Sequence, residues 1–396
     1  MKELKNRIYL DCAATTPVDP IILKAMLPYF SNNFGNASSI HHFGQAALAG
    51  VDLARDQLAK FLGCQAKEII FTSGASEADN LAVQGVIKAS PYGKKSHIIT
   101  SRIEHPAVLE TCKSLEKQGL AQVSYVGVNK KGLVEVGAIR KLIKPTTVLV
   151  SIMYVNNEIG TIQPIAQIGK MITGKNQGRK NKIYFHTDAV QAANYLDCQV
   201  DPLGVDLLSL SGHKIYGPKG VGALYIRLGT AIKHYTYGGE QEFGLRPGTL
   251  NTAAIVGFGK AVELIRTKDR VRANQQIRKN RDLLSKGILA RIKDIKINGD
   301  LIKRVPSNLN VSFKNVEGES LLLMLDLVGI SVSTGSACAS GALSASPILL
   351  ALGLSHSDAH GSLRFTLGQD VTTSDINKVV AVLPSLVKKL RQIAPK

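Results

Sequence analysis

Short apolar runs alternate with segments of helical periodicity along the first two thirds of the chain. The apolar runs are bounded by polar or glycine-containing turns, which is typical of buried strands; they span residues 96–100, 122–126, 147–153, 182–186, 206–210 and 222–226. Residues 51–62 and 78–88 carry apolar side chains at helical spacing, and the first of these segments ends at Gly63. This alternation predicts an α/β fold whose large, mostly parallel sheet is flanked by helices.

The pattern changes after about Phe258. A long basic segment with helical character comes first, followed by predicted strands at 309–313 and 330–332 and a final helix at 374–392. We therefore predict a large domain formed by residues 16–262 and a smaller α+β domain formed by residues 1–15 and 263–396. In the smaller domain residues 334–361 are rich in Ser, Ala and Gly, so we expect a flexible loop there.

The composition is that of an ordinary globular protein. Apolar residues make up 44% and charged residues 20% of the 396 positions. No apolar run is long enough to span a membrane and the first residues contain no signal-like core, so we expect a cytoplasmic location and no membrane partner. The five cysteines are odd in number and form no C-x-x-C pair, which favours reduced thiols over a zinc site or a disulfide framework.

The net charge of +19 is high, and it could attract nucleic acid or an acidic protein. Much of the excess is local, because residues 264–296 contain eleven Lys or Arg against three Asp. These basic residues lie on predicted helices without interleaved aromatic residues. We therefore favour a solvated helix face, keep a docking surface as the alternative, and expect no direct binding of nucleic acid.

The most informative segment is Ser211–Gly220, which follows the apolar run at 206–210 and carries Lys214. A lysine that is desolvated at the end of a strand loses its charge and becomes a nucleophile toward a carbonyl group. Taken alone, the segment could equally be a basic, glycine-rich surface turn. The residues predicted to lie around Lys214 therefore decide between these two interpretations.

Two further segments bear on that choice. Residues 71–79 read as a strand, a glycine-containing turn and a helix start, where free N–H groups and the Ser76 hydroxyl can bind phosphate. Asp188 ends another strand, where a carboxylate can keep a pyridine nitrogen protonated, and Gln191 lies one helical turn further on. Asp188 and Lys214 are 26 residues apart, one βαβ step, so both should emerge at the same edge of the sheet. Together these features predict a pyridoxal phosphate pocket.

Other polar residues at predicted strand ends fit the same pocket. His105 can lie over the cofactor ring and move protons, Asn157 offers an amide to the ring oxygen, and Arg364 can clamp a substrate carboxylate. Each of these alone could be a satisfied polar residue at the end of a strand. Cys338 lies among small residues in the predicted loop, where a thiol is accessible and reactive. The other four cysteines adjoin apolar segments, and we expect them to act as buried apolar residues.

Taken together, these segments resemble the class V aminotransferase-like enzymes, and within them the cysteine desulfurases of the NifS/IscS group. The similarity runs from near the N-terminus to about Gly368, and Ser211–Gly220 and the Cys338 loop are its most specific parts. The matching stretches are residues 9–17, 71–80, 104–105, 155–160, 188–191, 211–220, 246–249, 335–341 and 364–368.

The resemblance implies a fold-type I homodimer whose active sites lie at the subunit interface. It implies that Lys214 binds pyridoxal phosphate covalently, that Asp188 pairs with its ring nitrogen and that His105 stacks on the ring. Gln191 and Asn157 would surround the ring oxygen and the substrate. The phosphate would be held by a set of groups that includes one from the other subunit: Ala75, Ser76, Ser211, His213 and the partner copy of Thr249.

The resemblance also implies a reaction. Arg364 would bind the carboxylate of L-cysteine, Lys214 would remove the Cα proton, and the Cys338 thiolate would attack the substrate sulfur. The products would be L-alanine and a persulfide on Cys338, which would pass to an acceptor such as an iron–sulfur scaffold, a tRNA thiolation enzyme or a sulfur carrier protein. The long loop around Cys338 is similar to that of the NifS/IscS group.

Three positions depart from the family pattern: Cys12 replaces the usual Asn, Ser76 the usual Thr, and Phe243 a residue that is basic in many relatives. The sequence stops soon after its last predicted helix, so we expect no extended tail of the kind through which housekeeping members contact the scaffold. Two alternatives stay open. One is a different pyridoxal phosphate enzyme of this fold, such as a selenocysteine lyase or an aminotransferase. The other is a basic RNA- or protein-binding module that has lost catalysis.

Overall fold

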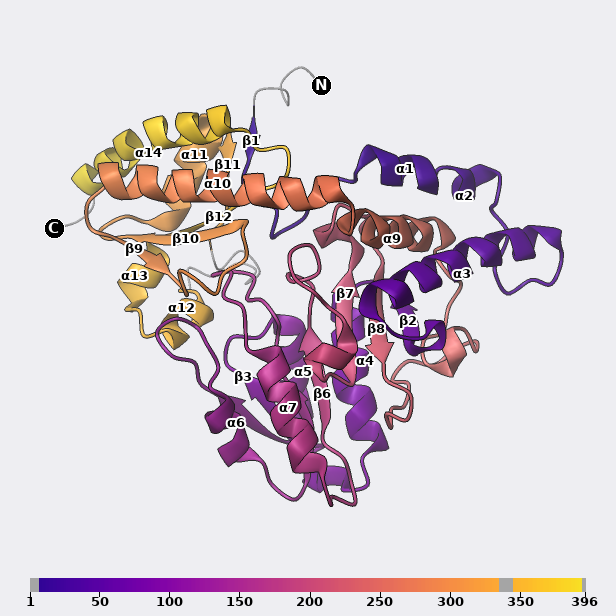
Figure 1. Ribbon diagram of the computed structural model, residues 1–396. Helices are drawn as coiled ribbons and strands as arrows, with labels where there is room; N and C mark the ends of the chain where they lie inside the picture. Colours follow the sequence, from indigo (N-terminus) through magenta and orange to yellow (C-terminus); the bar gives the residue numbers. More distant parts are fainter. Residues whose placement is uncertain (1–6, 335–344, 394–396) are drawn as a thin grey trace.

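A seven-stranded sheet dominates the computed structural model (Figure 1), which describes residues 7–334 and 345–393. The strand order is β2-β8-β7-β6-β5-β3-β4. All strands run parallel except β8, which is antiparallel to both neighbours. This topology confirms the predicted α/β fold. The strands are β2 (Ile69–Thr72), β3 (His97–Ser101), β4 (Gln122–Val126), β5 (Thr147–Ser151), β6 (Tyr184–Asp188), β7 (Leu207–Ser211) and β8 (Gly222–Ile226).

Helices cover both faces of this sheet, and the strand sequences explain why. Successive residues point to opposite faces: Ile98 packs into one core with α4 and α5, whereas Ile99 packs into the other with α3, α7 and α9. Strands that are buried on both faces read as continuous apolar runs, the signal that located them in the sequence. The covering helices are α3 (His42–Leu62), α4 (Ala75–Ala89), α5 (Pro106–Lys117), α6 (Val136–Leu142), α7 (Ile165–Asn176), α8 (Val200–Leu203) and α9 (Thr252–Ile265).

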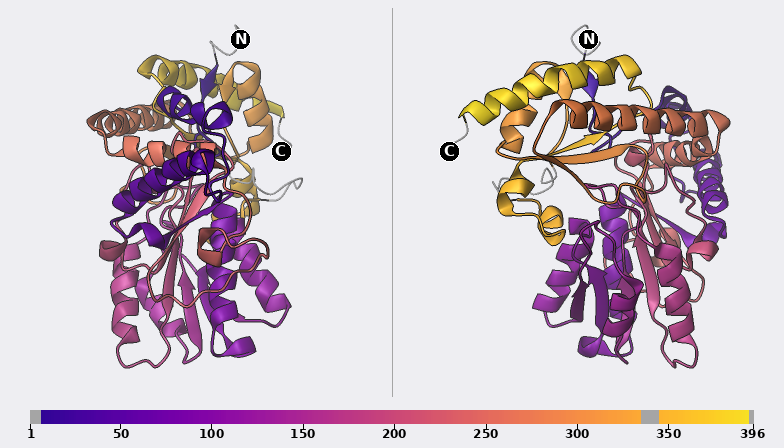
Figure 2. Two further views of the ribbon diagram at one scale, coloured as in Figure 1. Left: turned by 90° about the vertical axis from the view of Figure 1, so that its right-hand side faces the viewer. Right: turned by 60° about the vertical axis from the view of Figure 1, so that its left-hand side comes forward.

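A smaller antiparallel sheet, with strand order β12-β10-β9, lies in the upper half of the molecule in Figure 2. The long helices α10 and α14 pack side by side over it and share an apolar core with α11. A separate parallel pair joins β1, near the N-terminus, to β11. The elements are β1 (Ile8–Tyr9), β9 (Ile295–Asn298), β10 (Asn308–Phe313), β11 (Ile330–Ser331), β12 (Ser362–Thr366), α10 (Lys268–Arg291), α11 (Gly318–Leu327) and α14 (Thr373–Ile393). The domain boundaries proposed from the sequence stay a prediction.

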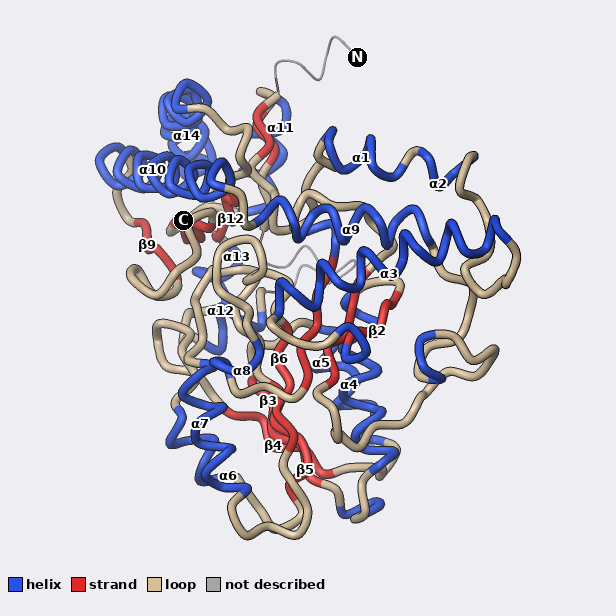
Figure 3. The backbone as a smooth tube through the Cα atoms, turned by 45° about the vertical axis from the view of Figure 1, so that its right-hand side comes forward, coloured by secondary structure: helices blue, strands red, loops and turns tan. Residues whose placement is uncertain are grey.

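Helices α1 (Pro20–Met26) and α2 (Pro28–Ser31) extend with the first half of α3 to one side of the molecule (Figures 1 and 3). This part of the chain leaves large apolar side chains in solvent: Phe30, in α2, is 64% exposed, and Ile40, in the connection before α3, is 92% exposed. No helix in the described parts of the chain is long and apolar enough to cross a membrane. Short 3₁₀ turns lie at Ala66–Glu68, Gly93–Lys95, Gly212–Lys214 and Glu242–Gly244.

The predicted flexible loop at 334–361 is wrong for its second half, where the chain forms α12 (Pro347–Ala351) and α13 (His356–His360). Proline at the first helical position and the Ser346 side chain start α12. Leu349 is buried in one apolar cluster with Ile103 and Ile159, which are distant from it in the chain. The sequence suggested a loop because this segment is rich in small residues. The short apolar stretch within it forms a helix by packing against residues that are distant in the chain. Residues 335–344, with Cys338, lie outside the described residues.

Candidate active site

A cavity of about 560 Å³ opens at the carboxyl edge of the large sheet. Asp188 is the last residue of β6 and Ser211 the last of β7, and these parallel strands are adjacent in the sheet. The structure therefore brings together the segments that sequence spacing placed at one edge. The predicted residues that line this cavity are Ala75, Ser76, His105, Asn157, Asp188, Gln191, Ser211, His213, Lys214 and Arg364.

One predicted residue within the described part of the chain, Thr249, is not among the groups that line the cavity. Thr249 is exposed on its own chain and lies elsewhere, and its predicted place is in the site of a second copy. Cys338 is outside the described residues.

Lys214 lies on the short turn that follows β7, and its Nζ donates to the carbonyl oxygens of Ala13 and Ala14 at 2.6 Å each. The turn is tight, because a Cβ on Gly212 would come within 2.9 Å of the Pro218 carbonyl oxygen. Tyr216 adopts a left-handed φ of 66°. Such strain at a buried residue is stabilised only by the surrounding structure, so the lysine is held in a fixed place.

Asp188 and His105 share the cavity with this lysine, and burial dominates the ionisation of both. Burial raises the pKa of Asp188, while His105 and Lys214 oppose that shift. Burial lowers the pKa of His105, so its imidazole is neutral. The Asp188 Oδ1 accepts from Val190 N at 2.9 Å, and the His105 Nδ1 accepts from Ala107 N at 3.1 Å. With Nδ1 engaged, the ring carries its proton on Nε2.

The predicted phosphate side of the cavity is the turn Ser73–Ser76 at the start of α4. No side chain caps this helix, and the first N–H groups of a helix have no partner within it. His213 lies nearby, its Nδ1 3.2 Å from Thr15 Oγ1, and burial lowers its pKa to about 4. The backbones pack closely here, because a Cβ on Gly222 would come within 2.5 Å of the Gly74 carbonyl carbon. Backbone N–H groups and neutral donors at a helix start form an anion-binding site.

Arg364 enters the cavity from β12. Its side chain is 4% exposed and forms an ion pair of 2.8 Å with Asp11, and it also donates to the Asn157 carbonyl oxygen at 3.1 Å. The Arg364 Nε and the Asn157 Oδ1 are buried without hydrogen-bond partners in the described structure. Buried polar atoms without partners are costly, so two such atoms in one cavity indicate a polar ligand.

The sequence interpretation missed the part played by Asp11–Thr16. This segment reaches the site from the N-terminus: Ala13 O accepts from Gln191 Nε2 at 3.0 Å as well as from Lys214, and Thr16 Oγ1 donates to His213 O at 2.9 Å. Residues 9–17 match the family pattern, but nothing in their spacing shows what they contact. A local signal could not have assigned these roles, because every contact is long-range.

Three further titratable groups lie buried near Asp188: Asp79, which also lines the cavity, Glu104 and His186. Burial and the charge of Asp188 raise the pKa of Asp79 well above its usual value, although the Ser209 hydroxyl opposes the shift. His186 Nε2 is 3.5 Å from Asp79 Oδ1, and burial lowers the pKa of His186 to about 3. Burial raises the pKa of Glu104 to about 8.

The other cysteines follow the prediction in part. Cys12, Cys112 and Cys198 are buried, whereas Cys64 is partly exposed. Burial is the main cause that raises the thiol pKa of all four to about 12, which leaves them as unreactive thiols at neutral pH.

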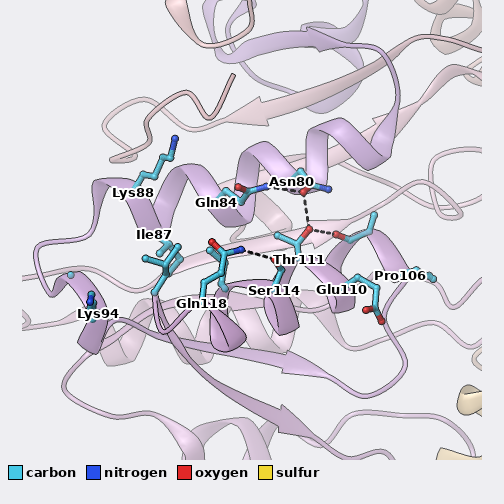
Figure 4. A pocket seen from close by; sticks show the side chains of 14 residues that line it. Asn80, Gln84, Ile87, Lys88, Lys94, Pro106, Glu110, Thr111, Ser114 and Gln118 are labelled. Carbon is cyan, nitrogen blue, oxygen red and sulfur yellow. Dashed lines mark hydrogen bonds between the residues drawn. The ribbon is translucent and has the colours of Figure 1, made fainter. Parts of the chain in front are cut away.

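A second cavity, of about 580 Å³, lies between α4 and α5 (Figure 4). It contains none of the predicted site residues. Its polar side chains bond one another: Thr111 Oγ1 and Gln84 Nε2 both donate to Asn80 Oδ1 at 2.8 Å, and Gln118 Nε2 donates to Ser114 Oγ at 2.8 Å. We refer to it below as the α4–α5 groove.

Comparison with known proteins agrees with this geometry. Residues 8–379 match the model of the family "Aminotransferase class-V". The chain is 48% identical over 394 residues to a Clostridium botulinum protein named cysteine desulfurase IscS, covering 99% of this chain and 97% of that one. A protein of the same name from Methanosarcina thermophila is 48% identical over 388 residues, covering 98% and 94%.

Comparison with solved structures also finds similar proteins. A NifS-like protein matches with a TM-score of 0.86 at 36% identity, covering 98% of this chain and 99% of that one. A structure of SspA in complex with cysteine matches with a TM-score of 0.80 at 38% identity, covering 91% and 98%.

The chain therefore belongs to the class V aminotransferase family and, within that family, to the cysteine desulfurases of the IscS and NifS group. Members of the family use pyridoxal phosphate, and the fold is that of the fold-type I enzymes. The resemblance noted in the sequence is confirmed.

Proposed function

We propose that this chain converts L-cysteine to L-alanine and keeps the sulfur as a persulfide on Cys338, with pyridoxal phosphate bound at Lys214. The observation that carries the proposal is the meeting of Lys214, Asp188 and His105 in one cavity. In the same cavity, buried Arg364 presents an Nε without a partner in the described structure.

The residues fit pyridoxal phosphate. Asp188 can pair with the ring nitrogen, and the neutral His105 can lie against the ring. Gln191 and Asn157 supply amides near the ring oxygen, and the Asn157 Oδ1 has no partner within the described chain. The phosphate would meet a set of donors at the start of α4 and after β7: Ala75, Ser76, Ser211 and His213, with Thr249 of a second copy. The bound cofactor would supply an electron sink for the bond cleavage at Cα and Cβ.

Each side chain then has a definite task. Arg364 holds the α-carboxylate of L-cysteine through charge-assisted hydrogen bonds. Lys214, as a neutral amine, takes the Cα proton. The Cys338 thiolate forms a bond to the substrate sulfur as the Cβ–S bond breaks, and Cβ gains a proton. One L-cysteine and one thiol thereby become one L-alanine and one persulfide, with no external oxidant.

A homodimer is part of the proposal, and the exposed apolar side of the molecule supports it. Apolar patches of this kind mark protein interfaces in soluble proteins. The exposed side chains on α1, α2 and α3 and the turns between them are Ile21, Leu23, Leu27, Phe30, Phe34, Ile40 and Phe43. We further propose an acceptor protein for the persulfide and a cytoplasmic location, which cell fractionation would test. Direct contact with nucleic acid is not part of the proposal.

The test is Cys338→Ser, with Cys64→Ser as the matched control because Cys64 is the partly exposed thiol among the four described cysteines. Cys338→Ser should form alanine from L-cysteine roughly 1,000-fold more slowly while keeping the visible absorption of bound cofactor. Lys214→Ala should lose that absorption. Alanine formation at the normal rate by Cys338→Ser would refute the role of Cys338. Retention of the absorption band by Lys214→Ala would refute the role of the lysine.

A further inference from the structure

Glu77 is an unexpected residue at the proposed phosphate site. It lies in the first turn of α4 and lines the cavity together with Ser73 and Ser76. A cofactor phosphate is itself negatively charged, so an ionised Glu77 at this place would repel it unless another group compensated the charge. The phosphate-binding role of the α4 start does not account for a carboxylate there.

The contacts of Glu77 show how it is held. Its Oε2 accepts from Ser73 N at 2.6 Å, which closes the turn before the helix, and its Oε1 accepts from Arg246 Nε at 2.9 Å. The side chains of Glu77 and Arg246 are 16% and 22% exposed. Burial acts to raise the pKa of Glu77, but the bonds from Arg246 and Ser73 hold it below its usual value. Glu77 is therefore ionised at neutral pH, and Arg246 supplies the opposing charge.

The segment that carries Arg246 is itself fastened to the strand that leads into α4. Glu242 Oε2 accepts from Phe71 N at 2.6 Å, and Arg55 forms a buried two-point ion pair with Glu242, with N–O distances of 2.6 and 3.0 Å. Glu242 and Phe243 adopt left-handed φ angles of 45° and 56°, which cost free energy for residues with a Cβ. Two separate carboxylate contacts thus hold residues 242–246 against β2 and the first turn of α4.

We infer that Arg246 is a positioning residue for the cofactor phosphate, which compensates the charge of Glu77 so that this carboxylate can close the Ser73–Ser76 turn without repelling the phosphate. The inference rests on the proposed binding of pyridoxal phosphate. Arg246 does not line the cavity itself, so it acts through Glu77. Thr249, three residues further on, has its predicted place in the partner's phosphate site, which would make this segment serve both sites of a dimer.

The charges predict an asymmetry between the two single variants. Arg246→Gln leaves an ionised carboxylate uncompensated beside the phosphate and should weaken cofactor binding about tenfold or more. Glu77→Gln removes the negative charge and keeps an amide acceptor for Ser73 N, so its affinity should stay within about threefold of the unmodified chain. The double variant Glu77→Gln/Arg246→Gln should recover most of the affinity that Arg246→Gln loses.

The experiment is equilibrium titration of the cofactor-free, full-length chain with pyridoxal phosphate, followed by absorbance at low and high salt. High salt should reduce the loss of cofactor affinity in Arg246→Gln, because screening weakens the repulsion between the Glu77 carboxylate and the phosphate. Arg227→Gln is the matched control, since Arg227 pairs with Asp201 at 2.8 Å and is outside the cavity. It should bind the cofactor like the unmodified chain.

The outcomes separate this inference from the proposed function. Normal cofactor affinity in Arg246→Gln would overturn the inference. So would a loss that the double variant does not recover, because a purely structural role predicts additive damage. An unmodified chain that fails to bind pyridoxal phosphate would instead overturn the proposed function.

Discussion

Two cavities in the described part of the chain are nearly equal in volume, about 560 Å³ at the sheet edge and about 580 Å³ in the α4–α5 groove. They differ in what lines them. The sheet-edge cavity collects side chains from β6, the turns after β2 and β7, the N-terminal segment and β12. The groove is lined by two helices that are consecutive in the chain and by the turns beside them.

The states of their polar groups differ as well. In the sheet-edge cavity Asn157 and Arg364 have buried polar atoms without partners in the described structure, and burial shifts the pKa values of His105 and Asp188. In the groove, Asn80, Gln84 and Thr111 bond one another, and none of the described side chains there has a buried polar atom without a hydrogen-bond partner. A volume therefore does not identify a site, whereas the convergence of unsatisfied polar groups from distant parts of the sequence does.

Among the substitutions that test this comparison of the two cavities, the largest effect should come from Arg364. Arg364→Leu should lower kcat/KM for L-cysteine about 100-fold, because a hydrogen bond to a charged group contributes about 1.5–3 kcal/mol and the clamp makes two. The kcat/KM of Arg364→Lys should lie between those of Arg364→Leu and the unmodified chain. Lysine keeps the positive charge but lacks the planar guanidinium that makes two hydrogen bonds to a carboxylate. Steady-state assays with L-cysteine and with its decarboxylated analogue measure this.

The analogue is the control for the Arg364 prediction. It has no carboxylate, so turnover of the analogue should change much less in the Arg364 variants than turnover of L-cysteine. Equal losses with both substrates would mean that Arg364 supports the fold of the cavity and does not recognise the carboxylate.

An effect on stability should come from Glu104. Its pKa is raised from an ordinary 4.5 to about 8, so the folded state favours the protonated acid. The contribution of the protonated Glu104 to the stability of the folded state is complete below about pH 4.5 and is lost as the pH rises toward about 8. A glutamine side chain cannot ionise, so the stability of Glu104→Gln relative to the unmodified chain should increase across this interval. Urea unfolding at several pH values measures it.

Glu110, in the groove, is the matched control for Glu104. Its side chain is 67% exposed and pairs with Lys113, so Glu110→Gln should change stability little and without a trend across the same pH range. A flat difference for Glu104→Gln would contradict the buried, protonated state of Glu104.

The smallest effect should come from the groove. Ser114→Ala removes the acceptor of the Gln118 bond at 2.8 Å, an exposed contact, and should leave kcat/KM within about twofold and the melting temperature nearly unchanged. Kinetic assays and thermal unfolding check it. A large loss of activity with normal stability would show that the groove has a function and would break the distinction between the two cavities.

Much of the fold was readable in the sequence for a physical reason. Strands of a parallel sheet are buried on both faces, so each gives a continuous apolar run, and the predicted strands of the large sheet lie within two residues of the observed ones. The prediction failed at α12, where a short apolar stretch between small residues becomes a helix only by packing on Ile103 and Ile159. Local patterns do not contain that contact.

The sequence by itself predicted which side chains meet in the sheet-edge cavity. Three side chains and one helix start were identifiable in this way: Lys214, Asp188, His105 and the start of α4. The residues that follow a strand lie at the edge of the sheet, and the βαβ spacing indicates which strand ends lie at the same edge. Only the tertiary structure decided what surrounds them. Asp11 against Arg364, Ala13 and Ala14 on Lys214, and Arg246 on Glu77 are contacts between residues far apart in the chain. Each depends on packing between separate elements, and no local spacing encodes which elements meet.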